Sequence, residues 1–167
     1  MVYYTNLNSP VGNLGLVRDN QFLLRIYLPN EEVSKTILEK QFPDEDIIEN
    51  KSGFKNIINQ LTEYFAGKRK HFTIKMKLEI SPFYNNSLME VTKVPYGRTA
   101  SYSQIAKKLN NPKAARAVGT ANARNPIPII IPCHRIITKS GKLGGYAGGL
   151  KMKRYLLDLE KNYLNTD

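Results

Sequence analysis

The sequence predicts an α+β protein with two small domains: an antiparallel sheet with helices, and then a mostly helical domain that contains a helix-turn-helix. Three observations support this prediction. Short β-prone runs separated by turn residues open the chain, helical periodicity dominates later, and the charge balance changes near residue 80. The boundary falls at Ile80-Ser81-Pro82, so we expect domains over residues 1–80 and 81–167.

The first domain is expected to begin with a small antiparallel meander that is followed by two helices. Strand propensity, with Asn, Gly, Pro and Asp at the intervening turns, favours strands at Val2–Thr5, Leu14–Val17 and Phe22–Leu28. Apolar residues at helical spacing predict helices at Glu32–Gln41 and Phe54–Phe65, and a glycine followed by cations ends the second helix.

The second domain carries the signals of a helix-turn-helix. Ser101 and Gln104 match a capping box that opens a helix ending near Leu109. Asn111 suits the N-cap of the next helix, and Pro112 suits its first helical position. Two short helices joined by a tight turn are typical of DNA-binding domains. Longer helices are expected on both sides of this motif, at residues 83–93 and 150–164.

Positive charge is concentrated in the second domain. The chain has 25 Lys and Arg against 14 Asp and Glu, a net charge of +11. Residues 1–80 hold 11 basic and 10 acidic side chains (+1), whereas residues 81–167 hold 14 and 4 (+10). Such a concentration favours nucleic acid as the partner over a merely soluble basic surface. An anionic membrane is disfavoured because no basic helix has aromatic anchors on its other face.

Composition excludes several classes of protein. A single cysteine leaves no internal disulfide, and with only two histidines we expect no bound metal. The N-terminus lacks a basic segment followed by an apolar run, and no apolar stretch reaches transmembrane length. We therefore expect a cytoplasmic protein without membrane contacts.

The second helix of the expected helix-turn-helix has almost no side-chain bulk. Ala114, Ala115 and further small residues leave Arg116 as the long side chain near its start. Such a helix can lie close to a groove of DNA with Arg116 as a probe. It can equally pack against its neighbour through its alanines, and these residues leave both interpretations open.

The only cysteine, Cys133, follows an apolar segment in which three prolines exclude a helix. A lone buried cysteine is usually an inert apolar residue with a raised pKa. His134 and Arg135 follow it directly, and neighbouring cations favour the thiolate. Cys133 is therefore a candidate nucleophile, although residues adjacent in sequence need not touch.

Glu160 could complete a catalytic chain. It lies on the apolar face of the last expected helix, where a carboxylate is costly unless it is paired. It could orient His134 as the base for Cys133, or lie at the rim and pair with Lys153 or Arg154. The intervening GGYAGG segment (144–149) lacks the ending of a phosphate-binding loop, so nucleoside triphosphate binding is not indicated.

Three segments together resemble the O6-alkylguanine-DNA alkyltransferases, the methylated-DNA–protein-cysteine methyltransferases. They are PYGRTASYSQIA (95–106), NPKAARAVGTANARNPIPIIIPCHRII (111–137) and GKLGGYAGGLKMKRYLLDLE (141–160). SPVGNLGLV (9–17) and LTEYFAGKR (61–69) extend the resemblance, less specifically, to the first domain. The resemblance implies a ribonuclease-H-like first domain and a winged-helix-like second domain.

The resemblance also implies an activity. It is DNA repair by direct transfer of an alkyl group from O6-alkylguanine, and from O4-alkylthymine, in duplex DNA to Cys133. The thioether product cannot be hydrolysed, so each molecule would act once. No cofactor is implied, because the lesion itself supplies the alkyl group. The expected partner of this monomer is double-stranded DNA carrying O6-alkylguanine, bound in the minor groove with the damaged nucleotide flipped out.

The family's residue roles carry over to matching positions. Cys133 corresponds to the nucleophile, and His134, through a water, and Glu160 correspond to the relay that makes the thiolate. Among the substrate-binding residues, Tyr102 corresponds to the tyrosine that assists nucleotide rotation and donates to guanine N3, and Tyr146 corresponds to a wall of the alkyl pocket. The backbone carbonyls of Cys133 and Ile136 would accept from the guanine amino group, and the amide of Ala147 would approach O6. Asn125 corresponds to the hinge asparagine. The DNA-binding set is Arg116, which fills the base stack, with Ala114, Ala115, Ser103 and Arg135.

Two departures and three alternatives accompany this interpretation. Ala147 stands where some members carry serine, and the N-terminal zinc ligands of some members are missing. A non-catalytic relative that only flags lesions would lack the cysteine. A helix-turn-helix regulator would prefer one DNA sequence and accept no alkyl group. A thiol hydrolase would turn over repeatedly and leave the basic half unexplained.

Overall fold

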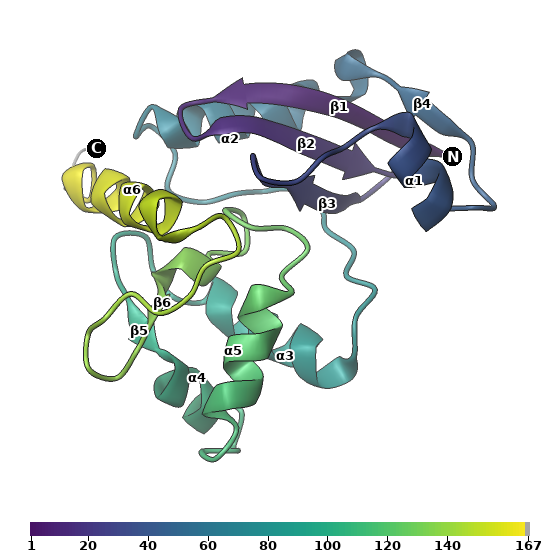
Figure 1. Cartoon of the computed structure of the whole chain (residues 1–167). Helices are drawn as coiled ribbons and strands as arrows, with labels where there is room; N and C mark the ends of the chain where they lie inside the picture. Colours follow the sequence, from purple (N-terminus) through teal and green to yellow (C-terminus); the bar gives the residue numbers. More distant parts are fainter. Residues whose placement is uncertain (166–167) are drawn as a thin grey trace. The chain divides into compact units, whose positions relative to one another are not determined.

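The computed structural model describes residues 1–165, and the chain divides into two compact units whose boundary in the sequence falls between Lys77 and Leu78 (Figure 1). The first unit contains a sheet with helices and the second is mostly helical, which confirms the predicted α+β class. Over the described residues, no helix is both long and apolar enough to cross a membrane.

The first unit is built on a four-stranded sheet with the order β3-β2-β1-β4. β1 (Val2–Ser9), β2 (Gly12–Arg18) and β3 (Leu23–Tyr27) form the predicted antiparallel meander. β4 (Ile47–Glu49), which the sequence analysis did not predict, adds a fourth strand that pairs parallel to β1. Three residues are too few to show the alternation that marks a strand in sequence.

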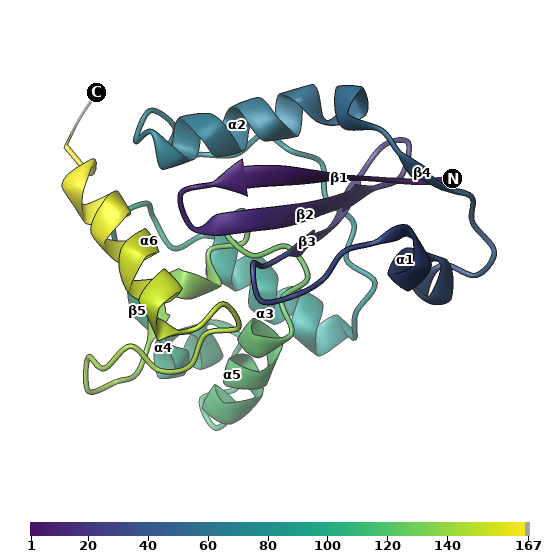
Figure 2. The ribbon, with the colours of Figure 1, turned by 45° about the horizontal axis from the view of Figure 1, so that its top comes forward.

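Two helices cover this sheet. Figure 2 shows α2 (Lys55–Phe65) along one side of the strands and α1 (Lys35–Gln41) on the other. α1 begins later than predicted because Ser34 is its N-cap, and Leu38 joins the core on its side of the sheet. A short 3-10 turn, η1 (Lys51–Phe54), leads directly into α2.

Over residues 78–165, the part of it that the structure describes, the second unit contains four α-helices and a two-stranded parallel sheet. α4 and α5 form the predicted helix-turn-helix and pack on α3. The short strands connect the start of α4 to the segment that follows the cysteine. The elements are α3 (Pro82–Thr92), β5 (Ala100–Ser101), α4 (Tyr102–Lys108), α5 (Ala115–Ala123), η2 (Cys133–Arg135), β6 (Ile136–Ile137) and α6 (Leu150–Asn162).

The two helix starts of the helix-turn-helix differ in how well the sequence predicts them. The capping box of α4 is confirmed: Gln104 N donates to Ser101 Oγ at 3.1 Å, and Ser101 N donates to Gln104 Oε1 at 2.7 Å. The predicted start of α5 at Asn111 is wrong. Ala114 N donates to Asn111 O at 3.0 Å, so these residues and the proline between them form a turn, and the helix begins at Ala115.

Candidate active site

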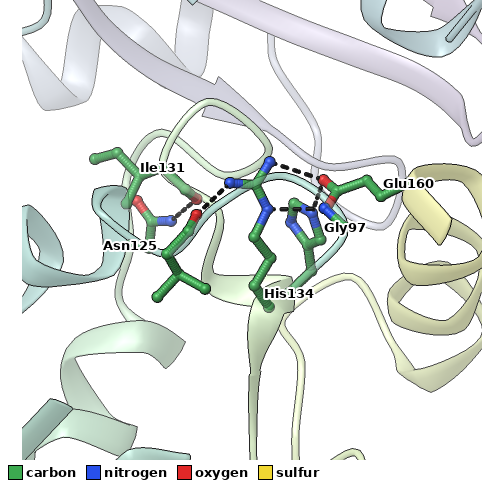
Figure 3. A network of polar contacts seen from close by, with 7 residues as sticks. Gly97, Asn125, Ile131, His134 and Glu160 are labelled. Atoms are coloured by element: carbon green, nitrogen blue, oxygen red, sulfur yellow. Dashed lines mark hydrogen bonds and ion pairs between the residues drawn. The ribbon is translucent and has the colours of Figure 1, made fainter. Parts of the chain in front are cut away.

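A buried loop between α5 and α6 positions the cysteine, and Asn125 holds this loop together. Asn125 Nδ2 donates to Ile131 O at 3.0 Å (Figure 3), while its Oδ1 accepts from Ile127 N at 3.0 Å. The same Nδ2 lies 3.2 Å from Cys133 Sγ. Ile129 adopts a φ of 74°, which is unfavourable for a β-branched residue. The loop is therefore conformationally constrained, and the hydrogen bonds of Asn125 hold it in place around the thiol.

Cys133 lines a cavity of about 470 Å³ in the second unit. Tyr102 of α4 and Asn122 of α5 contribute to its wall, and Tyr146 and Ala147 come from the glycine-rich loop. The structure thus brings four predicted site residues, Cys133, Tyr102, Tyr146 and Ala147, to one cavity. The volume falls within the range of small-molecule sites.

Glu160 on α6 organises the polar groups behind the cysteine. His134 Nε2 lies 2.6 Å from Glu160 Oε1, and Arg135 contacts both carboxylate oxygens at 2.9 and 3.0 Å (Figure 3). Gly97 N donates to Oε2 at 3.0 Å, and Arg135 Nη1 also donates to Val94 O at 2.7 Å. Glu160 has no exposed surface, so the alternative that placed it at the rim of the helix face is wrong.

These contacts determine the charges of the pair. Burial by itself raises the pKa of Glu160, but the hydrogen bond from His134 and the hydrogen bonds and charge of Arg135 outweigh it and lower the pKa to about 2. Burial lowers the pKa of His134 despite the nearby carboxylate. At neutral pH, a neutral imidazole therefore donates from Nε2 to an ionised Glu160, which makes Nδ1 the basic nitrogen.

Burial is also the main influence on the pKa of the Cys133 thiol. It raises the pKa of Cys133 to about 11, although the Asn125 hydrogen bond, the charge of Lys153 and two backbone amides act in the opposite direction. The side chains of His134 and Arg135 were expected to lower the pKa of the thiol, but they contact Glu160 instead. The resting protein therefore carries a protonated thiol at neutral pH.

Lys153 is a candidate functional residue that the sequence analysis named only as a possible partner of Glu160. This fully buried residue of α6 donates from Nζ to Ile136 O at 2.6 Å, Gly145 O at 3.2 Å and Leu143 O. Burial lowers its pKa to about 8. Lys153 thus ties the glycine-rich loop to the segment after Cys133. The Ile136 carbonyl, expected to accept from guanine, accepts from Lys153 here.

The expected DNA-binding residues separate into exposed and buried groups. Arg116 is exposed, and with Ala114 it lines an open hollow along α5, while Ala115 is half-buried. Ser103 lines a second hollow beside α4. Arg135 is 6% exposed and paired with the carboxylate of Glu160, which disfavours the expected DNA contact.

The chain matches two family models along most of its length. Residues 2–78 match the ribonuclease-like domain of 6-O-methylguanine DNA methyltransferase, and residues 82–162 match its DNA-binding domain. The chain therefore belongs to the 6-O-methylguanine DNA methyltransferase family.

Individual relatives cover nearly the whole chain. A methylated-DNA–protein-cysteine methyltransferase of Methanosarcina mazei is 43% identical over 164 residues, covering 98% of this chain and 99% of the relative. The crystal structure of Mycobacterium tuberculosis O6-methylguanine methyltransferase is 37% identical with a TM-score of 0.88, covering 100% of this chain and 97% of the other. A structure of the M. tuberculosis protein in complex with DNA has a TM-score of 0.86 at 38% identity and covers 96% of this chain and 94% of the other.

Proposed function

We propose that this protein repairs duplex DNA by transferring an alkyl group from O6 of guanine to Cys133 Sγ. The observation that carries the proposal is the position of the only thiol, which lines a cavity together with Tyr102, Tyr146 and Ala147. The second domain, residues 81–167, performs both DNA binding and transfer. O4-alkylthymine belongs to the same substrate class, because it also presents an alkyl group on an exocyclic oxygen.

The transfer is an in-line displacement. The Cys133 thiol gives its proton through a water to His134 Nδ1, and Glu160 holds the imidazole in the required tautomer. Sulfur then attacks the alkyl carbon, so the S–C bond forms as the C–O6 bond breaks. The electron pair passes to guanine, where the Tyr102 hydroxyl donates to N3 as charge develops. The product is a thioether, so each molecule acts once without a cofactor.

The substrate nucleotide must leave the duplex, because a base inside the stack cannot reach a buried thiol. The small residues at the start of α5, Ala114 and Ala115, allow this helix to lie close in the minor groove. Arg116 fills the stack behind the extruded nucleotide, and Ser103 contacts the backbone. We propose that the protein acts as a monomer in the cytoplasm, where a free thiol stays reduced.

Intact-protein mass spectrometry tests the proposed function. The protein is incubated with a duplex oligonucleotide that contains O6-methylguanine, and the added mass is mapped by proteolysis. The expected result is one methyl group per protein on Cys133, with none on the Cys133→Ala variant. Tight binding to the lesion without transfer would indicate a recognition protein. Sequence-selective binding without lesion preference would indicate a regulator.

A further inference from the structure

One wall of the Cys133 cavity contains a buried amide that the proposed chemistry does not use. Asn122 of α5 lines the cavity and is only 7% exposed. Neither its Nδ2 nor its Oδ1 reaches solvent or finds a hydrogen-bond partner within residues 1–165. The hydroxyl of Tyr146, on the same cavity, is shielded and without a hydrogen-bond partner in the same described part of the chain.

Buried polar atoms without partners are costly, because they lose their hydrogen bonds to water and gain none in return. Three such atoms on two residues of one cavity point to a polar ligand that completes their hydrogen bonds. A nucleobase has this character, since donors and acceptors alternate along its edges. An amide offers one donor group and one acceptor, and it therefore suits an edge that presents both.

We propose that the side-chain amide of Asn122 hydrogen-bonds the extruded alkylated nucleotide and is a substrate-binding residue of this protein. The inference rests on the proposed function and adds one polar contact to it. The amide has no hydrogen-bond partner among the described residues and gains one from the nucleotide. Asn122 therefore favours binding of the damaged nucleotide at the expense of the stability of the free protein.

Ser87 of α3 provides a matched control. Its hydroxyl is fully buried in the same unit and also has no hydrogen-bond partner among the residues that the structure describes. Unlike Asn122, Ser87 does not line the Cys133 cavity. Removing either polar group should therefore stabilise the free protein, whereas only removal of the Asn122 amide should affect the substrate.

The experiment measures single-turnover methyl transfer from an O6-methylguanine duplex, and urea unfolding, for the wild type, Asn122→Leu, Asn122→Ala and Ser87→Ala. Both Asn122 variants should lower the second-order rate constant about tenfold, the effect of losing one or two neutral hydrogen bonds. Asn122→Leu should unfold at higher urea than the wild type, and affinity for undamaged duplex should not change. Ser87→Ala should also be more stable, with wild-type transfer.

The outcomes separate the two proposals. If the wild type accepts the methyl group and both Asn122 variants accept it at the same rate, the Asn122 inference is overturned and the proposed function stands. An Asn122→Leu protein that is both less stable and slower shows that the amide supports the fold, and this also overturns the inference. If Ser87→Ala slows methyl transfer as much as the Asn122 variants do, the effect is not specific to the cavity, and the inference is again overturned. If the wild type accepts no methyl group, the proposed function fails, and the Asn122 inference fails with it.

Discussion

The carboxylate of Glu160 should contribute a large and pH-dependent part of the stability of the second unit. It is fully buried and accepts hydrogen bonds from His134, Arg135 and Gly97. Glu160→Gln keeps the shape of the side chain but removes its charge. The variant therefore leaves the buried guanidinium of Arg135 without a counter-charge, which is a strongly destabilising change.

The magnitude follows from the pKa. Folding lowers the pKa of Glu160 from its ordinary value of 4.5 to about 2. At about 1.4 kcal/mol for each unit of pKa, the ionised carboxylate stabilises the folded protein by about 3 kcal/mol. Because the folded pKa is the lower one, this contribution is complete above the unfolded pKa near 4.5 and disappears as the pH falls through about 2.

Urea unfolding followed by far-UV circular dichroism measures this contribution. Glu160→Gln should lose about 3 kcal/mol at neutral pH, and its difference from the wild type should shrink steadily as the pH is lowered from about 5 toward 2. Asp158→Asn, an exposed carboxylate on the same helix, is the control and should change the unfolding free energy by at most about 0.5 kcal/mol. A pH-independent loss in Glu160→Gln would refute the reasoning.

Three further predictions concern the thiol and its surroundings. Lys153→Met should slow methyl transfer at least about tenfold and expose residues 143–149 to limited proteolysis, because three carbonyl contacts are lost, whereas Lys151→Met at an exposed site should do neither. Without DNA, iodoacetamide should label Cys133 slowly at neutral pH and about tenfold faster for each pH unit toward 11, and a flat profile would contradict the raised pKa. Methylation of Cys133 should lower the melting temperature, because the added carbon crowds the Asn125 contact, and an unchanged melting temperature would refute this.

Local signals in the sequence predicted the helix-turn-helix well but not its turn. The capping box of α4 depends on Ser101 and Gln104 alone, and it forms as predicted. The start of α5 and the short strand β4 depend on tertiary contacts. Asn111 and the following proline are compatible with either a helix start or a turn, and packing of the two helices selects the turn.

Part of the candidate site was predictable because a charged residue, Glu160, occupies an apolar position in the sequence pattern. A glutamate on an apolar helix face requires a partner, and the structure supplies His134, one of the partners that the sequence left open. Lys153 lies on the same face of α6, one turn before Leu156, and this spacing was the available signal of its burial. Its carbonyl partners lie 8 to 17 residues away, in the glycine-rich loop and at the short strand β6, where no periodicity indicates contact.

The side chains of His134 and Arg135, which follow Cys133 in sequence, bind Glu160 and stabilise the surroundings of the thiol. His134 and Arg135 keep Glu160 ionised, the ionised Glu160 orients the imidazole of His134, and burial keeps that imidazole neutral. The thiol itself is left buried with a raised pKa. This arrangement suits a protein that can react only once, because an exposed thiolate would be consumed by other electrophiles. The thiolate should therefore form in the proposed reaction only after the alkylated nucleotide has entered the cavity, where transfer immediately consumes the charge.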